Sequence, residues 1–270
     1  MNETLLVTGA EGMVGSYAQT GIKLGREALD VTDYTAVMAA FETYHPESVI
    51  HLAAVTDQKA CEEDPGHAYL VNAIGAYHVA LAARTVGARM VYVSTNAVFD
   101  GKGGKPFETT GLPDPRSVYG RSKYAGECLV QGVLPQALVV RTSWVFGGGP
   151  AKDKKFVGSV MRQLQSGATE VRATSDVQGT PTYGRDFMSA LLALLADKKE
   201  GLMHLTNQGI CSRYDMALLL KEGAYSSTLV TPVPASTFGP GAPLQEALSG
   251  MTLRPWQEAL REYIQAEWVG

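Results

Sequence analysis

The feature that most constrains the fold is a glycine-spaced turn directly after the first apolar segment. Residues 4–8 predict a short buried strand, and Gly9, Gly12 and Gly15 follow it at three-residue intervals. In a dinucleotide-binding turn, the first glycine permits a tight bend, the second lets the backbone approach a pyrophosphate, and the third allows close helix packing. We expect a helical segment over about residues 13–20, whose N-terminus would present free N–H groups to the phosphates. A glycine-rich turn that binds no ligand is the alternative.

Apolar segments alternate with helical patterns along the whole chain. Strands are predicted at residues 22–24, 48–52, 89–93, 137–142, 170–173 and 201–205, and helices at 34–44, 68–86, 119–131, 156–165, 187–196, 214–222 and 256–268. This alternation predicts an α/β fold with a doubly wound parallel sheet of the Rossmann type and right-handed crossovers. Residues 1–147 would form the dinucleotide-binding core. Residues 148–270 would be a small C-terminal lobe, mainly of substrate-binding segments, with some segments returning to the core sheet. The stretch 230–243, rich in Pro and Gly, is predicted to be loop.

The second predicted strand indicates which dinucleotide would bind. An acidic residue after this strand favours NAD, whereas a basic residue can accept the 2′-phosphate of NADP. Arg26 has this place in the sequence, so we favour NADP(H) and leave NAD(H) open. Asp30 and Val31 are expected beside the adenine, although Asp30 also lies where a ribose-binding acid could fall. Asp33 is expected to cap the next helix.

Composition argues against several other classes of protein. The net charge of −4 gives no reason to expect a nucleic-acid partner, and no apolar run is long enough to span a bilayer. The N-terminal residues lack the basic start and the apolar stretch of a signal peptide. Cys61, Cys128 and Cys211 have neither metal-site nor disulfide spacing, so we interpret them as core residues of a cytoplasmic protein without a metal site. A homodimer is left open.

Tyr119 and Lys123 are the candidate catalytic pair. Their spacing of four puts them on one face of the predicted helix. An ammonium near a phenol favours the phenolate, so we expect Lys123 to lower the pKa of Tyr119 from its usual value of about 10. The phenol would then exchange a proton near neutral pH. Thr95, at the end of a predicted strand, would offer a hydroxyl to the same substrate oxygen.

Two further residues are expected to line the substrate pocket. Asn96 directly follows Thr95, and Trp144 follows the strand predicted at residues 137–142. For Trp144, a packed core aromatic is the alternative. His51, within a buried strand, is interpreted as a core histidine.

Taken together, these motifs resemble the extended short-chain dehydrogenase/reductase superfamily and, within it, the dTDP-4-dehydrorhamnose reductase family. The stretches that carry the resemblance are residues 9–15, 29–33, 51–56, 94–101, 118–127, 141–147 and 179–183. The resemblance implies an NAD(P)H-dependent oxidoreductase that reduces a 4-keto sugar nucleotide in deoxysugar biosynthesis. Tyr119 would donate the proton, Lys123 would also bond the nicotinamide ribose, and Thr95 would bond the carbonyl oxygen. The expected cofactor residues are Gly9, Gly12, Met13, Val14, Gly15, Arg26, Asp30, Val31, Leu52, Ala53, Ala54, Thr56, Ser94, Tyr119 and Lys123.

Two places depart from the family pattern. The family usually has Asp-Tyr where this chain has Asn96-Ala97, and it has a C-terminal Arg-Pro where this chain has Ala242-Pro243. Losing that arginine removes a charge-assisted contact with phosphate, so the sugar, the nucleotide and the product stereochemistry stay open. One alternative is a nucleotide-sugar epimerase or dehydratase with tightly held NAD, which would need a further acid or base that Asn96 does not supply. Another is a non-catalytic NADP-binding subunit, like the regulatory subunit of methionine adenosyltransferase.

Overall fold

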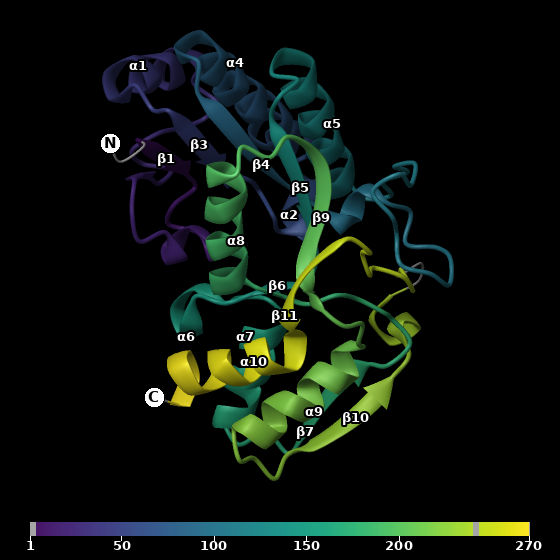
Figure 1. The fold of residues 1–270 in the computed structure, drawn as a ribbon. Coiled ribbons are helices and arrows are strands. Elements are labelled where there is room, and N and C mark those ends of the chain that lie inside the picture. Colours follow the sequence, from purple (N-terminus) through teal and green to yellow (C-terminus); the bar gives the residue numbers. More distant parts are fainter. Residues whose placement is uncertain (1–3, 240–242, 270) are drawn as a thin grey trace. The chain divides into compact units, whose positions relative to one another are not determined.

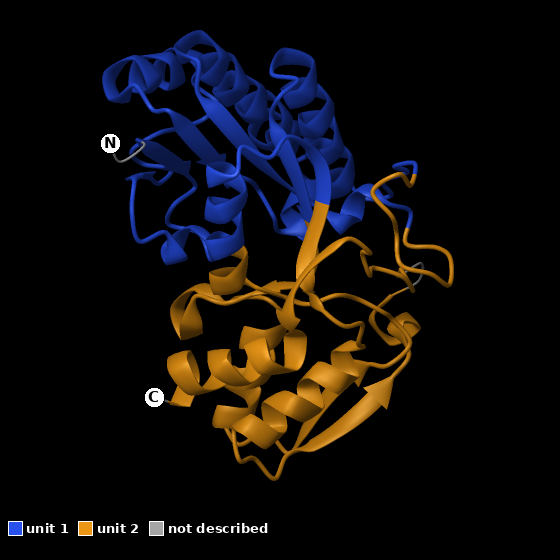
Figure 2. Ribbon diagram, in the orientation of Figure 1, with its two compact units in different colours: residues 1–100, 112–141, 188–203 blue, residues 101–111, 142–187, 204–270 orange. Residues whose placement is uncertain are grey.

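The computed structural model describes residues 4–239 and 243–269 (Figure 1). The chain divides into two units: unit 1 holds residues 1–100, 112–141 and 188–203, and unit 2 holds residues 101–111, 142–187 and 204–270 (Figure 2). These bounds follow packing and differ from the division at residue 147 that we expected from motifs. The substrate-binding role of residues 148–270 stays a prediction.

The sheet begins in unit 1 and confirms the predicted Rossmann-type fold. Its strands are β1 (Leu5–Thr8), β2 (Ile22–Leu24), β3 (Ser48–His51), β4 (Arg89–Thr95), β5 (Leu138–Thr142), β9 (Gly201–Gln208) and β11 (Met251–Pro255), in the order β11-β9-β5-β4-β3-β1-β2. Strand β1 pairs in parallel with both β2 and β3. Strands β2 and β3 therefore lie on opposite sides of β1, so the strand order reverses there, and parallel sheets bind ligands at such a switch point.

The core of unit 1 explains why its strands read as apolar runs. Every residue of β1, β3 and β5 is buried, as expected for parallel strands with both faces covered. Helix α4 (Ala76–Val86) packs against both α1 (Tyr34–Tyr44) and α5 (Val118–Val133), and α4 and α5 also contact β4. Asp33 caps α1 as predicted, because its carboxylate accepts a hydrogen bond of 3.0 Å from the Ala36 N–H.

The helix that we predicted over residues 13–20 is wrong. The structure has only a 3₁₀ helix, Gly15–Tyr17, with no side chain capping its start. The backbone becomes extended at Ala18 (φ −68°, ψ 109°). A single helical turn fixes several backbone angles for few hydrogen bonds, so it does not extend into a longer helix without further stabilising contacts. The glycine turn therefore has no α-helix N-terminus behind it, so only the backbone of the turn itself can receive a phosphate at this place.

The predicted helix 68–86 is part of a longer and more irregular segment. Helix α2 (Gln58–Glu63) ends at Asp64, whose carboxylate then caps α3 (Pro65–Tyr69) through the His67 N–H at 2.9 Å. Pro65 therefore stands at the first position of α3, where its missing N–H costs no helical hydrogen bond. A π-helical turn, Leu70–Gly75, joins α3 to α4, and such turns often occur at functional sites.

Unit 2 packs short strands and helices around an aromatic core. Its remaining elements are β6 (Val145–Phe146), α6 (Gly149–Lys152), α7 (Phe156–Gln165), β7 (Glu170–Thr174), β8 (Thr182–Tyr183), the start of α8 (Gly184–Ala196), α9 (Arg213–Gly223), β10 (Leu229–Val233), a 3₁₀ helix (Ala235–Phe238), α10 (Trp256–Ile264) and a π-helical end, Gln265–Val269. The rings of Phe146, Tyr183 and Tyr263 lie 5.4–5.5 Å apart.

Three sequence interpretations about single segments need correction or stay open. The predicted loop at 230–243 is wrong at its start, because β10 pairs with β7 in a two-stranded sheet. Pro232 is tolerated there since both strands of such a sheet are edges. Cys128 is exposed and is not a core residue, whereas Cys61 and Cys211 are buried. Ala242 lies outside the described residues.

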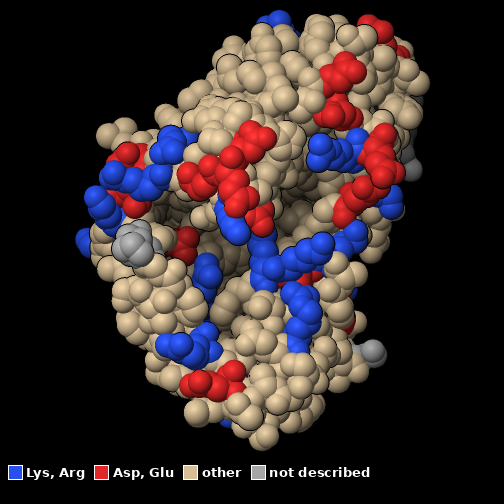
Figure 3. All heavy atoms as spheres, turned by 180° about the vertical axis from the view of Figure 1, so that it is seen from behind, with Lys and Arg blue, Asp and Glu red and all other residues tan. Residues whose placement is uncertain are grey.

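On the face that Figure 3 shows, acidic and basic side chains both occur, and a group of basic side chains lies side by side near the middle of the view. The net charge of the chain is −4. Among residues 4–239 and 243–269, no helix combines the length and the apolar character that a bilayer crossing requires.

Candidate functional site

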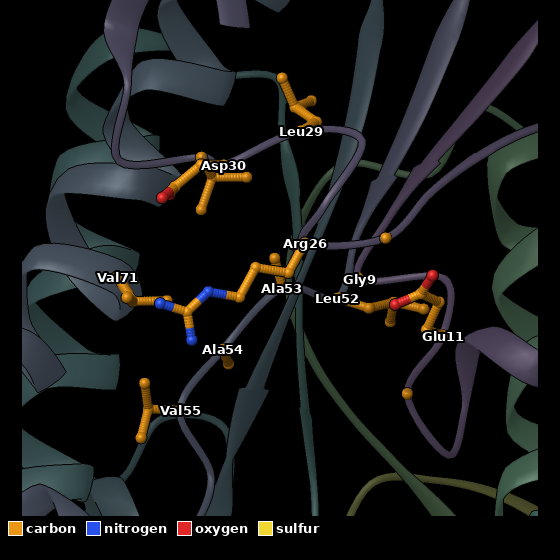
Figure 4. Close-up of a pocket in the computed structure, with 13 residues that line it drawn as sticks. Gly9, Glu11, Arg26, Leu29, Asp30, Leu52, Ala53, Ala54, Val55 and Val71 are labelled. Atoms are coloured by element: carbon orange, nitrogen blue, oxygen red, sulfur yellow. The ribbon is translucent and has the colours of Figure 1, made fainter. Parts of the chain in front are cut away.

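A cavity of about 230 Å³ lies at the switch point of the sheet in unit 1 (Figure 4). The turn after β1, the segment after β2, the segment after β3 and the π-helical turn all contribute to it. Its lining residues are Gly9, Glu11, Gly12, Gly25, Arg26, Leu29, Asp30, Val31, Leu52, Ala53, Ala54, Val55 and Val71. The structure therefore brings together eight of the expected cofactor residues, which are Gly9, Gly12, Arg26, Asp30, Val31, Leu52, Ala53 and Ala54.

The floor of this cavity is backbone, because side chains do not fit there. Gly9 has φ +65°, and a Cβ on it would lie 2.5 Å from the Ala53 backbone nitrogen. The Gly12 N–H donates to the Gly9 carbonyl at 3.0 Å, which closes the turn. A Cβ on Gly15 would lie 2.6 Å from Ala10 Cα, so this glycine serves close packing inside unit 1. A bare turn of this kind fits the pyrophosphate of a dinucleotide, which needs close backbone approach.

Opposite charges lie on two sides of the cavity. In Figure 4 the exposed Arg26 side chain extends towards Val71, whereas Glu11 lies on the other side near Gly9. A guanidinium placed after β2 can bind a 2′-phosphate. Asp30 accepts hydrogen bonds from the Thr32 N–H at 2.9 Å and the Thr32 hydroxyl at 2.7 Å. These bonds, with a smaller contribution from Arg26, lower the pKa of Asp30 and keep it ionised.

The other expected cofactor residues do not line this cavity. They are Met13, Val14, Gly15, Thr56, Ser94, Tyr119 and Lys123. Ser94 is buried, and its hydroxyl donates to a carboxylate oxygen of Glu127. Glu127 also accepts two hydrogen bonds from the buried Arg141, at 2.9 and 2.6 Å. Ser94 is therefore engaged in a buried polar network.

Thr95 and Tyr119 come from the end of β4 and the start of α5. Ser117 caps α5 through the Gly120 N–H at 3.0 Å, which fixes the first turn that carries Tyr119. The Tyr119 ring packs against a small apolar cluster that includes Cys61 and Ala68. The Thr95 hydroxyl accepts from the Ala97 N–H and donates to the Asn96 side-chain oxygen, both at 3.2 Å.

The predicted lowering of the Tyr119 pKa is wrong for this structure. Burial raises the pKa of Tyr119 to about 12, and hydrogen bonding with Thr95 opposes this only in part. Burial also lowers the pKa of Lys123 to about 7, against the opposing attraction of Glu127. Desolvation disfavours the charged form of each group and is the largest cause of both shifts. The phenol is thus protonated at neutral pH, which suits a proton donor.

Asn72 connects this region to the segment beside the cavity. Its side-chain oxygen accepts from the Val55 N–H at 2.8 Å, and its amide donates to the Val55 carbonyl at 3.0 Å and to the Ser122 hydroxyl at 2.9 Å. Asn72 is fully buried in the π-helical turn. It therefore ties the cavity residue Val55 to the helix that carries Tyr119 and Lys123.

Trp144 belongs to unit 2 and has polar as well as aromatic contacts there. Its backbone has φ +43°, and its indole N–H donates to Glu246 at 2.9 Å. The Arg213 guanidinium lies 5.0 Å from the ring centroid, and a Cβ on Gly179 would lie 2.5 Å from ring atom Cδ2. Asn96 belongs to unit 1 and is half-buried. The substrate roles expected of Asn96 and Trp144 stay predictions.

Comparison with known proteins identifies the family. The family model described as the RmlD substrate binding domain matches residues 3–268. The chain belongs to the RmlD family. This confirms the predicted relationship to the dTDP-4-dehydrorhamnose reductases.

Two curated relatives and one solved structure of the RmlD type illustrate the similarity. The dTDP-4-dehydrorhamnose reductase of Mycobacterium tuberculosis is 40% identical over 96% of this chain and 91% of its own length. The spore coat polysaccharide biosynthesis protein SpsK of Bacillus subtilis is 35% identical over 97% of this chain and 96% of its own. The dTDP-4-dehydrorhamnose reductase of Bacillus anthracis, solved in complex with NADP, is 30% identical, covers 98% of this chain and 100% of that chain, and gives a TM-score of 0.93.

Several residues of this RmlD-family site were missed by sequence reasoning. Glu11 is the most polar of them, and a Cβ on Gly25 would lie 2.5 Å from its carboxylate oxygens. Its place between the first two glycines could have drawn attention to it. Val55 and Val71 carried no such signal, because their contact with the cavity depends on the loop after β3 and on the π-helical turn.

Proposed function

We propose that this chain is an NADP(H)-dependent reductase that acts on the keto group of a sugar nucleotide of the dTDP-4-dehydrorhamnose type. The observation that carries the proposal is a neutral, partly buried phenol beside a hydroxyl, in the same unit as a glycine-floored cavity. The relatives, which include dTDP-4-dehydrorhamnose reductases and one such reductase solved with NADP, support the substrate class and the cofactor.

The cofactor would be held by residues from three parts of unit 1. Gly9 and Gly12 would receive the diphosphate on bare backbone, and Arg26 would pair with the 2′-phosphate. Leu52 and Ala53 would lie against the adenosine half. When bound and reduced, the nicotinamide supplies the hydride that the reaction needs.

Each polar side chain near Tyr119 then has a separate task. The Tyr119 hydroxyl gives its proton to the carbonyl oxygen as the carbonyl carbon receives the hydride, so the product is an alcohol and Tyr119 is left as a phenolate. Thr95 donates a hydrogen bond to the same oxygen and stabilises its developing charge. Lys123, when charged, would stabilise the phenolate and would bond the nicotinamide ribose. Water then returns the proton to Tyr119.

The test is Tyr119→Phe, assayed by NADPH consumption with a dTDP-4-keto-6-deoxy sugar. We expect NADPH affinity, measured by fluorescence titration, to stay within a few-fold of the wild type. The turnover number should fall by about 10²–10⁴, since this is the usual contribution of a positioned general acid. Normal turnover of the Phe variant would refute the proposed role of Tyr119.

The same assay separates the alternatives. Interconversion of sugars without consumption of free NADPH would indicate an epimerase or dehydratase with retained NAD. Binding of NADP with no turnover of any 4-keto sugar would indicate a non-catalytic subunit. A cytoplasmic location and a homodimer also stay predictions; light scattering after gel filtration tests the second.

A further inference from the structure

Lys123 is buried, so its ammonium needs a neighbouring group that stabilises the positive charge. Lys123 is 3% exposed, and burying an ammonium without a partner is costly. The carboxylate of Glu127 attracts it, but that carboxylate already accepts two hydrogen bonds from Arg141 and one from Ser94. Another group must therefore stabilise the charge.

The ring of Tyr92 supplies such a group. Lys123 Nζ lies 4.1 Å from the ring centroid, within the range of a cation–π contact. The negative face of the ring attracts an ammonium, and this attraction is stronger where water is excluded. Tyr92 is fully buried, so the contact is of the stronger kind.

Several elements of unit 1 fix the Tyr92 ring in place. Its hydroxyl shares one proton between the carbonyls of Asn72 and Lys123, each at 3.2 Å. The His51 ring stacks on it at 5.9 Å with an interplanar angle of 17°, and His51 Nδ1 lies 2.7 Å from the Thr8 hydroxyl. Strands β1, β3 and β4, the π-helical turn and α5 therefore all contribute to its position.

Tyr92, His51 and Tyr119, three titratable groups around Lys123, are neutral near pH 7. Burial raises the pKa of Tyr92 well above its usual value, so the ring stays neutral and keeps its negative face. Burial lowers the pKa of His51 to about 3, so this neighbour adds no positive charge near neutral pH. Tyr119, on the preceding turn of α5, is protonated there as well.

We propose that Tyr92 is a positioning residue. The face of its ring holds the Lys123 ammonium in place and favours the charged form of Lys123 that the reaction uses. The proposal rests on the proposed function only where it gives Lys123 a part in that reaction. The contact between the ring and the ammonium is a property of the protein without its ligands, and it can be tested separately.

The first experiment follows the titration of Lys123 by NMR in ligand-free protein with ¹³Cε-labelled lysine. The Lys123 signal is assigned from its loss in Lys123→Met. Tyr92→Phe keeps the ring and should titrate close to the wild type. Tyr92→Leu removes the ring, which disfavours the ammonium, so the midpoint should fall by about one pH unit, a tenfold change in proton affinity.

Two further variants exclude a general effect of core damage. Phe41→Leu removes a fully buried ring from the same core, and it should lower stability without moving the Lys123 midpoint. Trifluorophenylalanine at position 92 keeps the shape of phenylalanine but weakens the negative face. It should lower the midpoint relative to Tyr92→Phe, and it provides the decisive comparison if Tyr92→Leu does not fold.

The second experiment measures kcat/KM against pH in the same variants, because this ratio reports the ionisation of the enzyme without its ligands. In Tyr92→Leu the loss of activity on the alkaline side should move to lower pH by the same amount as the NMR midpoint. Unchanged Lys123 titration without the ring, or an equal shift in Phe41→Leu, would overturn the proposal. Full turnover of Tyr119→Phe and Lys123→Met would instead overturn the proposed function, while the NMR titration would still decide the ring contact.

Discussion

Two glycines on helix α5 should respond to alanine in opposite directions. Gly126 lies in the middle of the helix, and a Cβ there would lie 2.5 Å from the Asn72 carbonyl oxygen and still closer to the Tyr92 hydroxyl. Gly132, near the end of the same helix, has no heavy atom within 4 Å of such a Cβ. Neither glycine has a positive φ, so only the neighbours distinguish the two sites.

The expected magnitudes follow from these neighbours. Alanine is favoured over glycine in a helix by up to about 1 kcal/mol, so Gly132→Ala should stabilise the protein by about 0.5 kcal/mol. At Gly126 the same gain is opposed by overpacking of about 1–3 kcal/mol and by loss of the Tyr92 hydrogen bonds, about 1 kcal/mol. We expect a net loss of about 2 kcal/mol.

Equilibrium unfolding in urea, followed by circular dichroism, measures both changes in the free energy of unfolding. The pair is informative because helix propensity contributes to both variants and steric contact to only one. A Gly126→Ala protein as stable as the wild type would refute the inferred close approach of α5 to Tyr92 and the π-helical turn.

Two other predictions concern the charged residues of unit 1. Arg26→Ala should weaken NADPH binding about 10- to 150-fold and leave NADH binding unchanged, because a hydrogen-bonded contact to a charged group contributes about 1.5–3 kcal/mol. Fluorescence titration with both dinucleotides checks this, and equal weakening for both would contradict it. The control is Arg84→Ala, which removes an exposed arginine from the last turn of α4. Lys123→Met should abolish reduction yet stabilise the fold, more at pH 6 than at pH 9. Below the folded pKa of about 7 the buried ammonium destabilises the native state in full, and this cost fades as pH rises towards the ordinary pKa of 10.5. Urea unfolding at the two pH values measures the difference, and equal stabilisation at both would count against a buried charge.

The local pattern of the sequence was sufficient to predict most strands and the face shared by Tyr119 and Lys123. Buried parallel strands are apolar throughout, and a spacing of four is a local property of a helix. The glycine spacing also predicted a turn without side chains, because glycine adopts φ +65° without strain and lacks the Cβ that would clash with the Ala53 backbone.

What the sequence could not decide depends on neighbours that are distant along the chain. The direction of the pKa shifts of Tyr119 and Lys123 follows from burial, which β4, α2, α3 and α5 create together. In the sequence, nothing distinguishes Tyr92 from the other apolar residues of its strand. Only the fold brings His51, Asn72 and Lys123 next to it. Desolvation and cation–π attraction depend on three-dimensional packing, so the tertiary structure alone decided them.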